Sequence, residues 1–183
     1  MQFSNEISAL VALLEAAGFL VTTLGVQDIL DEKLKTVDYD VFIMADNYPR
    51  ENITNLVKEY WLGGGGVLTF NAAFGFLTYA GILFPGEEGD DGYGLVWDEE
   101  TWSSHEVVKR HPVTRNFQTE AILSEDSQDN KEWFNGPFIQ ENSPIAPYFE
   151  VLANQSDGMG LSSIVSLDNV MNGGRVVGMA VNT

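Results

Sequence analysis

Apolar residues recur in the first half of the chain at spacings that predict alternating helices and short strands. Ile7, Leu10, Val11 and Leu14 fall on one face of a helix over 5–17, which Ser4 can cap. Ordered along the chain, the pattern predicts helices over 5–17, 28–35, 51–61 and 74–79 and strands over 19–24, 39–44 and 67–70. Short apolar strands alternating with amphipathic helices are typical of a parallel sheet covered on both faces. We therefore predict a doubly wound α/β arrangement for this half.

The second half has a different pattern. Strands are predicted over 105–109, 148–153, 162–167 and 175–181, with turns near 111–114, 157–158 and 172–174. The connections between the last three strands are too short to hold crossover helices, so antiparallel additions to the sheet are expected. The predicted fold is a three-layer, flavodoxin-like α/β sandwich with a mostly parallel central sheet and antiparallel C-terminal additions.

The N-terminal end raises a question of sheet order. A doubly wound fold normally starts with a strand before its first helix, and only three residues precede Ser4. We expect one domain over 1–183 that is a segment of a longer protein. We also expect the strands at 19–24 and 39–44 to pair directly, or to flank a strand from another molecule or from later in the sequence.

Ligand sites in open α/β sheets lie beyond the carboxyl ends of the strands. Asn71 and Ala72 directly follow one predicted strand, and Asn47 follows the strand before it. With His111, which precedes Pro112 in a predicted turn, these residues form the predicted ligand-binding set. The four glycines at 63–66 precede a strand, and no Lys-Ser/Thr pair follows them. They are interpreted as a helix stop and turn, not as a phosphate loop.

Charge narrows the range of partners. The 183 residues include 27 acidic and 9 basic side chains, giving a formal net charge of −18. This balance argues against nucleic acid and anionic membrane surfaces as partners. No apolar run approaches ~18 residues, so membrane insertion is not expected. The acidic surface suits a high-salt, extracellular or exported setting. Carboxylates in two polar loops offer Ca²⁺ as an alternative to the expected absence of any cofactor or metal: Asp90, Asp91, Asp126, Asp129 and Glu132.

The order of several motifs resembles the class I glutamine amidotransferase-like domain, and within it the non-amidotransferase branches that include ThuA-like and uncharacterised archaeal and bacterial proteins. The motifs are the helix leading into 63–70, the elbow at 71–74, the segment 111–117 and the terminal segment 174–178. The resemblance covers roughly residues 4–182 and implies a flavodoxin-like fold. Amidotransferases present a catalytic Cys at the elbow, where this chain has Asn71 and Ala72. Because the sequence contains no Cys, glutaminase chemistry is excluded.

Two functions follow. The first is a non-catalytic module for ligand binding or protein assembly, acting as a homo-oligomer or with other domains of the same longer chain. The alternative is a ThuA-like, carbohydrate-acting enzyme in which Asn71, His105, His111 and nearby carboxylates share one pocket. Six aromatic residues of the second half are expected mainly in the core, although such residues also bind sugar rings: Trp97, Trp102, Trp133, Phe134, Phe138 and Tyr148.

The net charge predicts a salt dependence of stability. Uncompensated negative charges repel one another, and salt shortens this repulsion from ~10 Å at 0.1 M to ~3 Å at 1 M ionic strength. The melting temperature, followed by circular dichroism, should therefore rise with NaCl concentration. An unchanged melting temperature would mean that the acidic groups are already paired or cation-bound.

Overall fold

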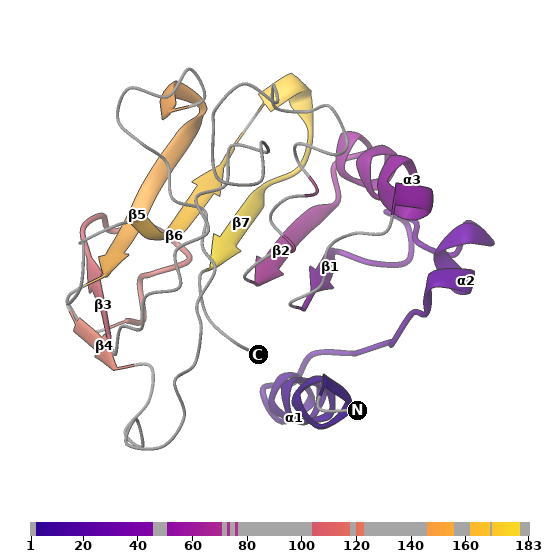
Figure 1. Ribbon diagram of the computed structural model, residues 1–183, viewed down its shortest axis with the longest axis horizontal. Helices are drawn as coiled ribbons and strands as arrows, with labels where there is room; N and C mark the ends of the chain where they lie inside the picture. Colours follow the sequence, from indigo (N-terminus) through magenta and orange to yellow (C-terminus); the bar gives the residue numbers. More distant parts are fainter. Residues whose placement is uncertain are drawn as a thin grey trace.

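An open, seven-stranded mixed sheet organises the protein (Figure 1). The computed structural model describes residues 3–45, 51–70, 73, 76, 104–117, 120–122, 146–155, 162–168 and 170–179. The strands are β1 (Val41–Met44), β2 (Gly66–Phe70), β3 (Ser104–Val107), β4 (Glu120–Ile122), β5 (Phe149–Gln155), β6 (Ser162–Leu167) and β7 (Val176–Met179). The helices are α1 (Phe3–Ala16), α2 (Val26–Leu30) and α3 (Glu51–Leu62), with 3₁₀ turns η2 (Ala146–Tyr148) and η3 (Val170–Asn172). None of these helices is long and apolar enough to cross a membrane.

The strand order is β1-β2-β7-β6-β5-β3-β4, so the last strand in the chain lies in the middle of the sheet. The β1–β2 and β2–β7 pairs are parallel, and the other four pairs are antiparallel. The predicted antiparallel arrangement of the C-terminal strands is confirmed. The prediction of a mostly parallel sheet is wrong for the described strands, because antiparallel strand pairs outnumber parallel ones.

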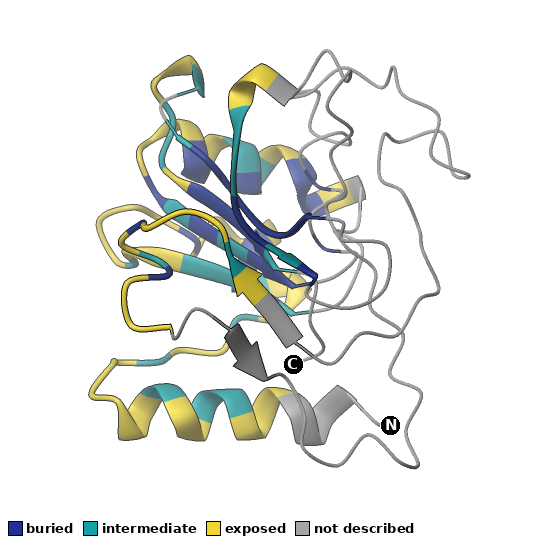
Figure 2. Cartoon of the chain, turned by 90° about the vertical axis from the view of Figure 1, so that its left-hand side faces the viewer, coloured by how far each residue is buried: buried dark blue, intermediate teal, exposed yellow. Residues whose placement is uncertain are grey.

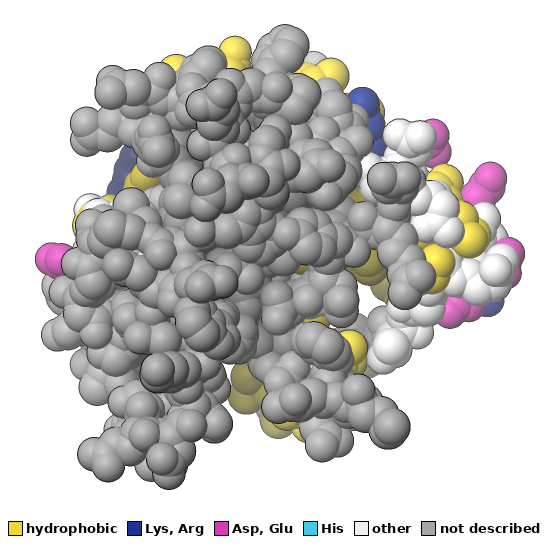
Figure 3. All heavy atoms as spheres, viewed as in Figure 1, with side chains coloured by type: hydrophobic (Ala, Val, Ile, Leu, Met, Phe, Trp, Pro, Cys, Tyr) yellow, Lys and Arg dark blue, Asp and Glu magenta, His cyan; other side chains and the backbone are white. Residues whose placement is uncertain are grey.

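One face of the sheet packs against α2 and α3. Val57 and Trp61 of α3 have no exposed surface, and they join a core that includes Val67, Val165 and others from the strands. Figure 2 shows buried residues on the strands and on the helix side that faces them. A smaller cluster on the opposite face contains Leu152, Ile164 and Val177. Val26 and Leu30 of α2 are exposed hydrophobic residues. Figure 3 shows hydrophobic and acidic side chains close together on the side of the molecule where α2 lies.

The first predicted helix is confirmed as α1, but its packing differs from the prediction. Gly18 ends the helix at φ +90°, with Phe19 N–H donating to Leu14 O at 3.0 Å. The described side chains of α1 are at most half-buried, and Leu13 is 67% exposed. Figure 1 shows α1 apart from the sheet, so this helix does not cover a sheet face as the predicted doubly wound arrangement requires.

The predicted strand at 19–24 is also wrong. This segment is irregular, with Phe19 63% and Leu20 102% exposed. Its apolar and β-branched residues favour a strand, but strand propensity takes effect only when a neighbouring strand is present. Within the described part of the chain, β1 ends the sheet and pairs with β2 alone. Segment 19–24 therefore pairs with no strand among the described residues of this chain.

The other described strands and α3 match their predictions with small changes at their ends, whereas α2 is shorter than predicted and begins earlier. The helix predicted over 28–35 is the five-residue α2, which ends where Glu32 takes a positive φ of 58°. The strand β4 is not predicted, because three residues carry too little pattern. The helix predicted over 74–79 lies outside the described residues, apart from Phe76.

The glycine segment after α3 ends the helix as predicted. Gly64 has φ +97°, and its N–H donates to Trp61 O at 2.9 Å while Gly65 N–H donates to Tyr60 O at 3.1 Å. This pair of bonds satisfies the last carbonyls of the helix. Tyr60 donates its hydroxyl to Tyr39 O at 3.0 Å, and burial, with the nearby Asp40 charge, raises the pKa of Tyr60 to about 12.

The chain entering β7 is bonded to the end of α3 in both directions. Trp61 Nε1–H donates to Gly174 O at 2.6 Å, and Gly174 N–H donates to Trp61 O at 2.8 Å. Glycine is needed on this segment because a Cβ on Gly174 would lie 2.0 Å from Gly65 O, and a Cβ on Gly173 would lie 2.4 Å from the Trp61 ring. The contact joins the helix layer to the centre of the sheet.

Replacing Gly174 tests this contact. In Gly174→Ala the new methyl group meets backbone that cannot move freely, so the free energy of unfolding should fall by about 3 kcal/mol, the upper range for overpacking. Urea unfolding followed by tryptophan fluorescence measures the change. Gly25→Ala is the matched control, because its Cβ would meet Asp28 Oδ2 at an ordinary 3.4 Å. Equal stability of the two variants would contradict this account.

Candidate functional site

The candidate site begins at a turn that follows β3. His111 N–H donates to Thr114 Oγ1 at 3.2 Å, and Thr114 N–H donates to His111 O at 3.0 Å. The Thr114 hydroxyl donates in turn to Lys109 O at 2.9 Å. Val113 packs on the small hydrophobic cluster of the second sheet face. The turn predicted at 111–114 is confirmed, and these contacts fix the His111 ring over that face.

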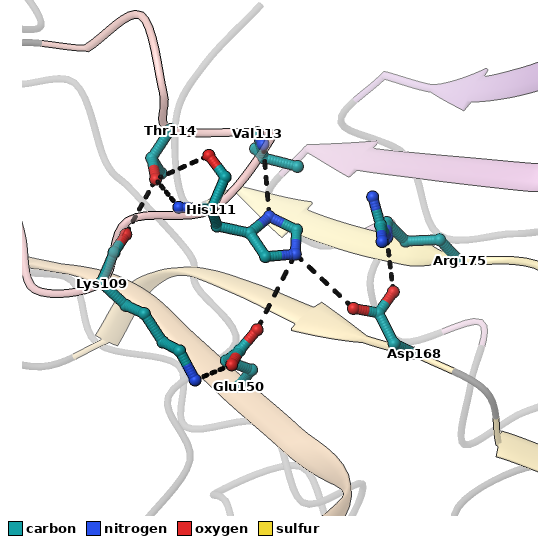
Figure 4. Close-up of polar contacts among 7 residues, drawn as sticks. All are labelled: Lys109, His111, Val113, Thr114, Glu150, Asp168 and Arg175. Atoms are coloured by element: carbon teal, nitrogen blue, oxygen red, sulfur yellow. Dashed lines mark hydrogen bonds and ion pairs between the residues drawn. The ribbon is translucent and has the colours of Figure 1, made fainter.

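The His111 ring points to two carboxylates from other parts of the chain (Figure 4). His111 Nε2 lies 3.7 Å from Glu150 Oε2 and 3.6 Å from Asp168 Oδ2. Glu150 belongs to β5, and Asp168 directly follows β6. The His111 side chain is 8% exposed, while the two carboxylate side chains are 31% and 27% exposed. The three groups thus form a largely buried donor and two partly accessible acceptors around one point.

Each carboxylate divides its oxygens between a cation and the imidazole. Lys109 Nζ contacts Glu150 Oε1, and Arg175 Nε contacts Asp168 Oδ1 at 2.5 Å. The second oxygen of each group is the one that faces His111. Two acidic and two basic groups therefore balance each other around the histidine, and one oxygen of each carboxylate remains directed into the cluster.

The backbone selects the imidazole tautomer. Val113 N–H donates to His111 Nδ1 at 3.2 Å, so Nδ1 is an acceptor and the proton of the neutral ring lies on Nε2. A metal-binding histidine coordinates through one unprotonated nitrogen and donates through the other. The three side chains match the residue types of a metal site. However, the Val113 bond makes Nε2 a donor, and this favours a hydrogen-bonding site over a cation site.

Four residues of this cluster are not predicted by the sequence patterns: Lys109, Glu150, Asp168 and Arg175. Among these four residues, only Glu150 stands out in the local sequence, because it is a charged residue at the otherwise apolar start of a predicted strand. Asp168 and Arg175 flank the predicted turn at 172–174, which brings them together as a pair. Their approach to His111 depends on the strand order.

The other predicted ligand-binding residues, Asn47, Asn71 and Ala72, lie outside the described residues. The strands that precede them, β1 and β2, end at Met44 and Phe70. The parallel strand β7 ends at the same side of the sheet, at Met179. Asp168 lies at the opposite end of the strands, because Leu167 pairs with Val176 at the start of β7. The chain therefore leaves β1 and β2 at one end of the strands, whereas His111 lies near the other end.

His105 does not lie with His111. It sits on β3 opposite Gln155, five residues along β5 from Glu150. At ~3.3 Å per residue this is about 16 Å of strand. The acidic residues Asp98, Glu99 and Glu100, and those of the two candidate calcium loops, lie outside the described residues. Of the predicted aromatic set only Tyr148 is described, and it is 56% exposed rather than in the core.

Comparisons with known proteins support the fold. No protein-family model matches the sequence. No curated protein matches it either. A crystal structure of a ThuA-like protein from Bacteroides uniformis is similar with a TM-score of 0.60 at 21% identity, over 99% of this chain and 74% of that one. A cytoplasmic protein from Salmonella typhimurium aligns with a TM-score of 0.48 at 14% identity, over 89% of this chain and 65% of that one. The first likeness shows that the chain has the fold of a ThuA-like protein.

The tautomer of His111 is directly measurable. Long-range ¹H–¹⁵N NMR should show the proton of the neutral ring on Nε2 and a bare Nδ1, and one equivalent of Zn²⁺ should leave these signals in place. The chain has two histidines, so His111→Gln assigns the spectrum and reveals Zn²⁺ effects that arise elsewhere. A proton on Nδ1, or a Zn²⁺ shift that disappears in His111→Gln, would contradict the assignment.

Proposed function

We propose that the protein is a non-catalytic binding module whose site at His111, Glu150 and Asp168 recognises hydroxyl groups of a neutral carbohydrate. The observation that carries this proposal is the convergence of one N–H donor and two acceptors at separations of 3.6 and 3.7 Å. These separations exceed the lengths of direct hydrogen bonds, so the three groups do not satisfy one another and can bond a ligand hydroxyl that approaches beside them.

The chemistry of a sugar fits this donor and acceptor set. A hydroxyl group can accept from His111 Nε2–H and donate to one carboxylate, and a neighbouring hydroxyl can donate to the other. Tyr148, two residues before Glu150, offers an exposed aromatic ring for the CH face of a sugar. The net charge of −18 disfavours anionic ligands, so the proposal is limited to sugars without acidic groups.

The proposed family placement is the non-amidotransferase branch of the class I glutamine amidotransferase-like domains, with a flavodoxin-like core. It is supported by the ThuA-like fold neighbour and by a chain without Cys. A non-catalytic role is consistent with a histidine that donates through Nε2, because a general base needs an unprotonated nitrogen.

A carbohydrate-acting enzyme is the second candidate. An imidazole and two carboxylates around one point are groups that acid-base catalysis uses. The two candidates differ in a simple assay, since a binding module leaves a sugar unchanged. Product formation that is lost in His111→Gln, detected by NMR or chromatography, would favour the enzyme.

Binding can be tested with ¹⁵N-labelled protein and a panel of glucose, galactose, mannose and maltose. At least one sugar should shift the amide signals of Val113, Glu150 and Arg175. Glu150→Gln and Asp168→Asn keep the side-chain size but lose a charged acceptor, so Kd should rise by about 10- to 100-fold. Glu106→Gln, an exposed change on β3, is the matched control. Equal affinity of the site variants and the control would overturn the proposal.

A further inference from the structure

A buried hydroxyl without a hydrogen-bond partner among the described residues lies beside the cluster. Ser166 has no exposed surface, and its Oγ has no hydrogen-bond partner among the described residues. Most buried polar side-chain atoms in proteins are hydrogen-bonded, so an orphan of this kind calls for a physical explanation.

The register of the sheet places Ser166 at the floor of the site. Ser166 is the direct cross-strand neighbour of Glu150, so the two side chains share one face with Cβ atoms ~5 Å apart. Asp168 follows two residues later, and side chains at this spacing along an extended chain point to the same side. On the other strand, Ser166 pairs with Val177, a member of the small cluster on the face that Val113 covers.

We propose that Ser166 is a fourth ligand contact, whose hydroxyl receives an inward-pointing hydroxyl group of the sugar. This inference rests on the proposed function. The hydroxyl can both donate and accept, so it complements a sugar hydroxyl in either orientation. The site thereby distinguishes a sugar with a hydroxyl at the inward position from its deoxy analogue, because the analogue leaves Ser166 unpaired.

Contact with Ser166 requires a small movement of the cover. Its Oγ has no accessible surface, and the turn carrying His111 and Val113 lies over this face. The outer residues of this turn, Pro112, Arg115 and Asn116, are exposed, so they can shift without breaking core packing. Binding therefore includes a small outward shift of the turn, in which the His111 ring keeps its direction toward the two carboxylates.

Ser166→Ala separates a binding role from a structural one. Removing an unpaired buried hydroxyl should leave the melting temperature unchanged or raise it by about 2–4 °C. The same variant should bind the preferred sugar of the glucose, galactose, mannose and maltose panel about 2- to 10-fold more weakly. The wild type should discriminate between this preferred sugar and one of its monodeoxy analogues, and Ser166→Ala should not.

Ser163→Ala is the matched control. Ser163 is equally buried on the same strand but has a polar partner, and strand alternation places it on the opposite face. This variant should lose stability and keep the affinity of the wild type.

The possible outcomes test the two proposals separately. If the wild type binds none of the sugars, the proposed function fails. If the wild type binds and Ser166→Ala binds equally well, this inference alone fails. A fall in the melting temperature of Ser166→Ala to the level of Ser163→Ala would also overturn it, because the hydroxyl would then have a structural partner.

Discussion

The two hydrogen bonds between Trp61 and Gly174 hold the segment from which the chain enters β7. Trp61 of α3 bonds to Gly174 twice, because its indole N–H donates to Gly174 O and its backbone carbonyl accepts from Gly174 N–H. The strand that follows therefore enters the sheet beside β2 and not at an outer edge. All strands beyond β7 take their position from this placement. A helix to loop contact thus sets the topology of a mixed sheet.

The candidate site depends on the same contact. Arg175 directly follows Gly174, and its position decides where Asp168 lies across the η3 turn. Glu150 is one strand further out, and His111 reaches both carboxylates from a turn on the open face. The cluster therefore combines residues from three separate segments that the sheet brings together. Its polar groups lie on the sheet face opposite α2 and α3, where packing is lighter.

Sequence patterns predict elements that depend on neighbouring residues. They fail for elements that depend on a strand or side chain distant in the sequence. The helix α3 is predicted closely because its apolar spacing and its glycine stop lie within a few residues of each other. The segment 19–24 has equally clear strand composition but no adjacent strand to pair with, so it stays irregular. The turn that carries His111 is predicted from the residues around Pro112. Glu150 and Asp168 are not, because no local pattern encodes the antiparallel register that carries them to His111.

The divided carboxylates make the cluster an electroneutral patch in a strongly acidic protein. Lys109 and Arg175 each hold one oxygen of an acidic partner, so the charges cancel within the site while its inward oxygens remain strong acceptors. The protein has a formal net charge of −18, so its electric field repels anions at long range. The cluster itself carries little net charge. Ionic strength would then act on the protein as a whole and hardly on what the cluster binds. Selection of a ligand at this site would depend on the directions of hydrogen bonds and not on charge.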